Sequence, residues 1–132
     1  MGREHNLEDL LKRLKPFAEK ASEAMCCPFY LVGSALERDD PRDIDIYGRM
    51  SDEDFEIHFG PVAEWERQGR EGDWGTVRNS WSRLCVVLTQ WGWDVTGLYL
   101  DVQVKPASNF DRRIEKRILI GGQCEDAEVQ IL

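Results

Sequence analysis

One stretch of the chain, residues 29–50, constrains the fold more than any other. It begins with the apolar, strand-forming run FYLV, which ends in Gly33 and Ser34, and it continues eight residues later as DIDIY. Because side chains alternate along a strand, Asp43 and Asp45 of the second run lie on one face and its isoleucines on the other. Two neighbouring carboxylates repel each other, and a bound divalent cation would remove that repulsion. The stretch therefore predicts two strands, the second with an acidic, metal-binding face.

The order Gly-Ser, eight residues, Asp-Ile-Asp resembles the signature of the DNA polymerase β-like nucleotidyltransferase superfamily. In that family a strand ends in Gly-Ser, a short helix follows, and the next strand carries two metal-binding acids. A later strand supplies a third acid, for which Asp101 in the run LDVQV is the candidate here. The resemblance covers residues 28–49 and 97–105. Ala35 to Glu37 stand where members often carry a basic residue, and the chain has no room for the helical domain of larger members.

The resemblance implies both a fold and a reaction. The fold is an α+β sandwich, with a mixed β-sheet and helices packed mainly on one face. The reaction moves a nucleoside monophosphate from a nucleoside triphosphate to a hydroxyl of a small molecule, a nucleotide or a protein. Two Mg²⁺ or Mn²⁺ ions would be held by Asp43, Asp45 and Asp101, the last of which would prepare the acceptor hydroxyl. Gly33 and Ser34 would hold the triphosphate.

Two basic residues on the expected strands are further candidates for phosphate contacts. Arg49 shares the face of Asp43 and Asp45 if the strand stays regular. Lys105 follows Asp101 in the alternating pattern of a strand expected over residues 98–104. Lys105 also has a plainer reading, as a solvent-exposed lysine.

Helical spacing of apolar residues predicts the elements around these strands. A helix is expected from residue 7 to 25, kinked or split at Pro16, and a buried one from residue 81 to 91. Residues 52–59 and 109–117 are expected to form shorter helices, with residues 118–120 as an alternative edge strand.

The glycine-rich segment 61–77 is expected to be irregular. It contains Trp65 and Trp74, which would either stack on a nucleobase or cover the edge of the core. Further along, Trp81, Trp91 and Trp93 are expected in the core.

Composition limits the remaining possibilities. A chain of 132 residues is expected to be one domain, spanning residues 1–132. Its net charge of −8 disfavours a long nucleic acid as the acceptor and favours a small molecule or a protein. The four cysteines, at positions 26, 27, 85 and 124, form no metal-binding pair and fit free thiols in a reducing compartment. No signal peptide or membrane-length apolar run is present, so the expected location is cytoplasmic, away from membranes.

Two other functions fit the same residues. The chain could be a nucleotide-binding module without turnover. It also resembles, in size, the minimal nucleotidyltransferases that act as antitoxins by modifying a partner protein. The base, the acceptor and the oligomeric state, a homo-oligomer included, stay open.

Overall fold

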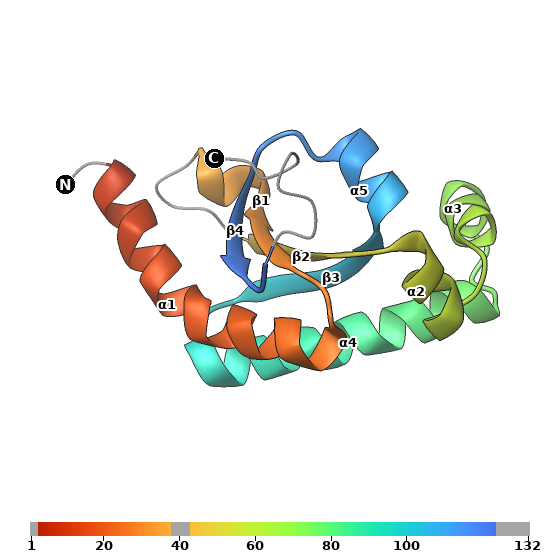
Figure 1. Cartoon of the computed structure of the whole chain (residues 1–132), viewed down its shortest axis with the longest axis horizontal. Coiled ribbons are helices and arrows are strands. Elements are labelled where there is room, and N and C mark those ends of the chain that lie inside the picture. The colour runs from red at the N-terminus through yellow and green to blue at the C-terminus, as the bar shows by residue number, and fades with distance from the viewer. Residues whose placement is uncertain (1–2, 38–42, 124–132) are drawn as a thin grey trace.

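The computed structural model describes residues 3–37 and 43–123, with side chains from residue 7 onward. Figure 1 shows a curved sheet with two long helices beneath it and a short helix above it. In chain order the elements are α1 (Arg3–Met25), β1 (Phe29–Val32), the 3-10 helix η1 (Gly33–Leu36), β2 (Ile44–Met50), α2 (Asp52–His58), α3 (Val62–Glu71), α4 (Thr76–Thr96), β3 (Leu100–Pro106), α5 (Ala107–Arg113) and β4 (Arg117–Gly121).

The four strands form one mixed sheet in the order β3-β2-β1-β4. β1 is antiparallel to both β2 and β4, whereas β2 and β3 are parallel. A parallel pair needs a long crossover, which α2, α3 and α4 supply here. β2 and β3 stay in register from Ile44 opposite Leu100 to Met50 opposite Pro106.

The apolar face of the sheet packs against α1 and α4, which also contact each other beneath it (Figure 1). Along β2 and β3, buried side chains alternate with half-buried ones, as the period of two requires. Leu31, Ile46 and Val102 form the centre of this face, and Phe17 of α1 and Leu88 of α4 cover it. Burying each such side chain stabilises the fold by about 1.5–3 kcal/mol.

The opposite face is covered only in part. Phe110 of α5 packs against Tyr30, with ring centroids 5.3 Å apart, and joins Val32 in a small second cluster. Asp45 and Asp101 lie on this face of β2 and β3, where both side chains are half-buried. The predicted α+β sandwich, with a mixed sheet and helices mainly on one face, is therefore confirmed.

The outer edge of β3 is sealed by polar groups from one side of α4. Trp81 donates to the carbonyl of Val104 at 2.6 Å, and Trp93 donates to that of Leu100 at 2.7 Å. Between them the Thr89 hydroxyl bonds both the amide of Val102, at 2.9 Å, and its carbonyl, at 3.2 Å. The backbone groups of an open edge strand can pair with a strand of another molecule. Here the side chains of α4 already bond to these groups of β3, so they are not available for such pairing.

The expectation of an irregular segment over residues 61–77 is wrong, because most of it forms α3. Packing outweighs the glycines: Trp65 is 2% exposed and contacts Phe55 and Trp81 at ring-centroid distances of 5.4 and 5.2 Å. The helix ends where Gly72 adopts a positive φ of 67°. Trp65 therefore covers the edge of the core, whereas Trp74 is 59% exposed on the loop that follows.

Other boundaries differ from expectation for similar reasons. Pro16 lies inside a continuous α1, so this helix is not split. The helix expected to end near residue 91 continues to Thr96, and Trp93, expected in the core, is 42% exposed because its indole turns to the β3 edge. β3 begins at Leu100, two residues later than expected. Arg117 leaves the expected helix and pairs with Val32 in β4, which matches the alternative edge strand.

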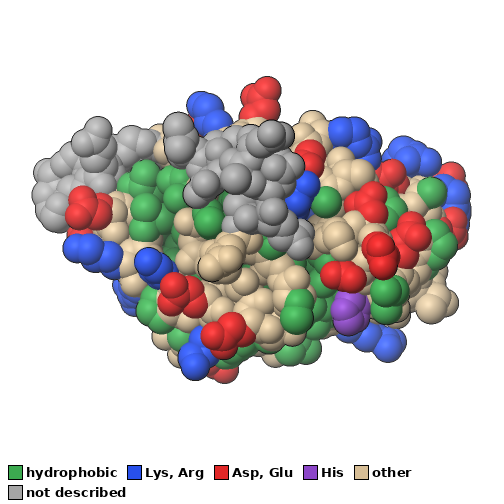
Figure 2. All heavy atoms as spheres, in the orientation of Figure 1, with side chains coloured by type: hydrophobic (Ala, Val, Ile, Leu, Met, Phe, Trp, Pro, Cys, Tyr) green, Lys and Arg blue, Asp and Glu red, His purple; other side chains and the backbone are tan. Residues whose placement is uncertain are grey.

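Cys26 and Cys85 are free thiols, Cys27 is buried, and Cys124 lies outside the described residues. None of the helices within the described ranges combines the length and the apolar character that a membrane-spanning helix needs. Figure 2 shows acidic and basic side chains interspersed over the end of the molecule where α2, α3 and α5 lie.

Candidate functional site

The parallel register of β2 and β3 places the predicted site residues side by side. Asp45 lies opposite Asp101, and two residues further along each strand Tyr47 lies opposite Gln103. Because alternate residues share a face, these side chains form one strip on the open side of the sheet. The strip carries acids where the two strands begin and cations where they end.

The two acids lie close enough to influence each other. Burial, and then the charges of Asp101 and Asp43, raise the pKa of Asp45 above its usual value. The amide of Gln103 donates to both carboxylate oxygens of Asp101, at 3.1 and 3.3 Å, and so holds that carboxylate in position. Asp43 precedes β2 and is exposed. The acids thus place like charges close together on one side of the sheet.

Gly33 brings the predicted Gly-Ser pair against Asp45. Its φ is +78°, and a Cβ atom at this position would lie 2.5 Å from Oδ2 of Asp45. Only glycine tolerates both the conformation and the approach. The half-buried Ser34 follows in η1, the short helical turn that the sequence predicts here.

A pocket of about 560 Å³ opens beside this pair, lined by Gly33, Ser34, Glu37 and the segment from Arg113 to Lys116. Lys116 forms a 2.8 Å ion pair with Glu37 across it. Arg113 places a basic group in this pocket beside Gly33 and Ser34. It was missed because the sequence shows it only as one charge of a short charged helix.

The donor atoms at the strip suit a divalent cation. Among residues 3–37 and 43–123, no group of three or more His, Cys, Asp or Glu side chains is arranged to hold a metal ion. Asp45 and Asp101 nevertheless offer the hard carboxylate oxygens that Mg²⁺ prefers, and their mutual repulsion is what a cation would relieve. The participation of Asp43 stays a prediction.

Arg49 lies further along the strip, where it is tied to α5. Its guanidinium makes two hydrogen bonds to the Asp111 carboxylate, at 2.9 and 2.7 Å, and Arg117 donates to the same carboxylate at 3.2 Å. These partners hold the pKa of Asp111 below its usual value. The structure thus gives Arg49 a structural role, and its contact with phosphate stays a prediction.

Lys105, opposite Arg49, is half-buried and not solvent-exposed. Its ammonium group lies 5.0 Å from the ring centroid of Tyr47, 5.5 Å from that of Trp65 and 5.4 Å from that of Trp81. Burial lowers the pKa of Lys105 to about 8, and the nearby Arg78 and Arg113 act in the same direction. Three aromatic faces stabilise the cation without neutralising it.

Lys105→Met is therefore expected to make stability less dependent on pH. The folded protein releases the Lys105 proton near pH 8, whereas the unfolded chain keeps it up to about pH 10.5, so wild-type stability rises with pH across this window. At pH 7 the variant should be more stable by roughly 1–3 kcal/mol, and the gain should shrink towards pH 10. Urea unfolding between pH 7 and 10 measures this, with Lys20→Met, at an exposed position on α1, as the control. A difference that stays constant with pH would contradict the assignment.

Comparison with known proteins adds no relative. No family model, no curated protein and no solved structure gives a significant match to this chain. What the chain does has to be argued from the strip and its surroundings.

Proposed function

We propose that this chain is a metal-dependent nucleotidyltransferase that transfers a nucleoside monophosphate from a nucleoside triphosphate to a hydroxyl acceptor. One observation carries the proposal: Asp45 and Asp101 lie in register on adjacent parallel strands, with Gly33 packed against the Asp45 carboxylate. A strand face that gathers acids beside a glycine turn is costly for stability, and a metal cation that also binds phosphate would explain it.

Each residue has a distinct part in this reaction. Asp45 and Asp101, joined by Asp43, would hold Mg²⁺ or Mn²⁺, which neutralises charge on the phosphates when bound. The Gly33 and Ser34 amides and Arg113 would hold the triphosphate in the pocket beside η1. Asp101 accepts the proton of the acceptor hydroxyl as its oxygen bonds to the α-phosphorus, and pyrophosphate leaves with the electrons of the broken bond. Gln103 keeps the Asp101 carboxylate oriented for this step.

A second candidate is a regulator that modifies a partner protein. It is favoured by exposed apolar side chains on α4, among them Val86 and Val87, which are 52% and 60% exposed. Val86 and Trp93 also line a pocket of about 440 Å³ that Asp101 and Gln103 border. A protein docked on this apolar surface would reach the Asp101 carboxylate.

Incubation with each radiolabelled nucleoside triphosphate, Mg²⁺ or Mn²⁺ and a cell lysate tests both functions. Label that moves to a small molecule with release of pyrophosphate supports the first, and label on one protein band supports the second. Nucleotide binding without label transfer under any condition would instead identify a binding module without turnover. The Asp101→Ala protein is the background control in each reaction.

Asp45→Asn is expected to leave the stability of the apo protein unchanged or raise it, while abolishing binding of the Mg²⁺-nucleotide. Since the folded-state pKa of Asp45 lies above the usual 3.8, its carboxylate lowers wild-type stability as the pH rises from the unfolded-state to the folded-state pKa, and the full cost is present above the folded-state pKa. Asparagine keeps the shape and removes the charge. Thermal unfolding with and without Mg²⁺ and nucleotide measures both effects. A large loss of stability in the apo variant would mean that Asp45 is structural.

A further inference from the structure

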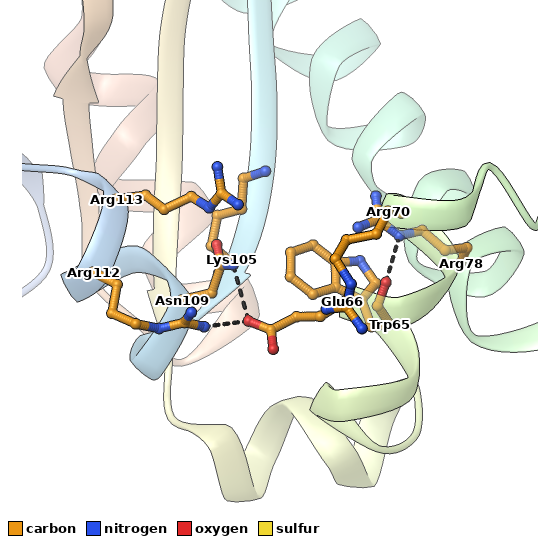
Figure 3. Close-up of a pocket in the computed structure, with 9 residues that line it drawn as sticks. Trp65, Glu66, Arg70, Arg78, Lys105, Asn109, Arg112 and Arg113 are labelled. Carbon is orange, nitrogen blue, oxygen red and sulfur yellow. Dashed lines mark hydrogen bonds and ion pairs between the residues drawn. The ribbon is translucent and has the colours of Figure 1, made fainter.

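A second pocket lies at the opposite end of the strip from the acids. It has a volume of about 350 Å³ and lies where α3, α5 and the first turn of α4 meet the end of β3. Figure 3 shows Lys105, Arg112 and Arg113 on one side and Glu66, Arg70 and Arg78 on the other. These are five cationic side chains and one carboxylate, in a chain whose net charge is −8. The pocket therefore concentrates positive charge against the overall balance of the molecule.

The single carboxylate of the pocket neutralises only one of its cations. Glu66 accepts a hydrogen bond from Asn109 at 3.1 Å and forms an ion pair with Arg112, which ties α3 to α5 (Figure 3). Within the part of the chain that the structure describes, Lys105, Arg70 and Arg113 form no ion pair with a carboxylate. The pocket thus holds several positive charges with no negative partner.

The more buried groups of the pocket have few hydrogen-bond acceptors. Arg78 donates one hydrogen bond to the Trp65 carbonyl at 2.9 Å. Its guanidinium carbon lies 4.3 Å from the ring centroid of Trp65 and 4.9 Å from that of Trp81. The indole Nε1 of Trp65 is buried and has no hydrogen-bond partner among the described residues. Burying donors without acceptors is costly, and an anion in the pocket would supply acceptors for the remaining N–H groups of its guanidinium side chains.

We propose that this pocket binds a phosphate group of the acceptor, so that the acceptor is a small phosphorylated molecule; the inference rests on the proposed function. Guanidinium groups match phosphate oxygens with paired hydrogen bonds, and a pocket of this size encloses a compact ligand and not a polymer. Lys105 lies four strand residues beyond Asp101, roughly 13 Å along β3. A nucleotide-sized acceptor would therefore place its phosphate at Lys105 and its hydroxyl at Asp101.

Arg113 connects this pocket to the triphosphate site, because it lines both. Lys105 and Arg70 line this pocket and not the one beside η1, which makes them the appropriate positions for a selective test. Arg83 is an exposed cation of α4 outside the pocket, so Arg83→Gln changes the net charge of the protein equally without touching the site.

Calorimetry with pyrophosphate as the probe, in EDTA and without metal, tests the pocket alone. The wild type should bind one pyrophosphate saturably. Lys105→Met should weaken binding by about tenfold or more, and Arg70→Gln by about threefold or more, whereas Arg83→Gln should stay within about twofold. Arg70 is exposed, so its replacement leaves the core untouched and tests the pocket independently of Lys105→Met. Absence of saturable binding, or equal weakening by Arg83→Gln, would overturn the proposal.

A competition experiment distinguishes binding of the acceptor's phosphate in this pocket from binding of the nucleotide's own phosphates. With the protein saturated by Mg²⁺ and a non-hydrolysable nucleoside triphosphate, pyrophosphate should still bind with an affinity within about threefold of its unloaded value. If the nucleotide excludes pyrophosphate, the pocket belongs to the nucleotide's own phosphates and the acceptor assignment fails. Failure of the proposed function would appear separately, as absence of Mg²⁺-dependent nucleotide binding in the wild type.

Discussion

Replacing Asp101 by alanine is expected to lower the rate of nucleotidyl transfer 100-fold or more while changing nucleotide affinity only a few-fold. In the proposed reaction, the change removes the carboxylate that would prepare the acceptor hydroxyl and take its proton, but it leaves Asp45 and the Gly33 turn in place. If that contact contributes about 3 kcal/mol in the transition state, its loss corresponds to a factor of more than 100 in rate. The effect should therefore fall on the chemical step and not on binding of the triphosphate.

Pyrophosphate release measures the rate, and calorimetry with the Mg²⁺-nucleotide measures affinity. Asp94→Ala, which removes an exposed acid from α4, is the matched control and should keep both values. Gln103→Ala should give a smaller loss of rate, because Gln103 acts only by orienting Asp101. If Asp101→Ala loses nucleotide binding and activity together, the division of roles between Asp45 and Asp101 is wrong.

Replacing Gly121 by alanine is expected to destabilise the fold by about 3 kcal/mol, or to prevent folding. Gly121 ends β4 opposite Phe29 of β1, and a Cβ atom there would collide with the backbone carbonyl of Ala18 in α1. Backbone atoms cannot turn aside as a side chain can, so either α1 or β4 must move from the core. Such overpacking costs 1–3 kcal/mol in ordinary cases and more where the backbone is involved.

Gly72→Ala is the control that separates collision from conformational strain. Gly72 has a φ of 67° but nothing within 4 Å of its would-be Cβ atom, so its replacement should cost only about 1–2 kcal/mol. Gly121 has no positive φ, and its cost should come from contact alone. Chemical denaturation of both variants beside the wild type gives the comparison. An equal or smaller loss for Gly121→Ala would contradict the close packing of α1 on β4.

Much of the fold could be predicted because a strand with one buried face shows an alternation of apolar and polar residues in the sequence. Asp45 and Tyr47 alternate with Ile44 and Ile46, and Asp101 alternates with its apolar neighbours in the same way. A period of two, with one face apolar, permits only one way of placing these strands on a core. Element boundaries were less predictable, because they depend on partners. α3 forms in spite of Gly69 because Trp65 packs against Phe55 and Trp81, which lie elsewhere in the sequence.

By itself, the sequence determined which residues face the open side of the sheet: Asp45 with its Gly33-Ser34 turn, and Asp101 on a later strand. Only the tertiary structure decided that Asp45 and Asp101 lie opposite each other, because strand order and register depend on how the α2–α4 crossover packs. The cationic pocket was likewise hidden. Arg70, Arg78 and Arg113 each look like ordinary surface charges in the chain, and only Lys105 was a candidate for phosphate contact. They become one site only when α3 and α5 pack around the end of β3. Alternation along a strand is a local property, whereas the convergence of charges from separate elements exists only after folding.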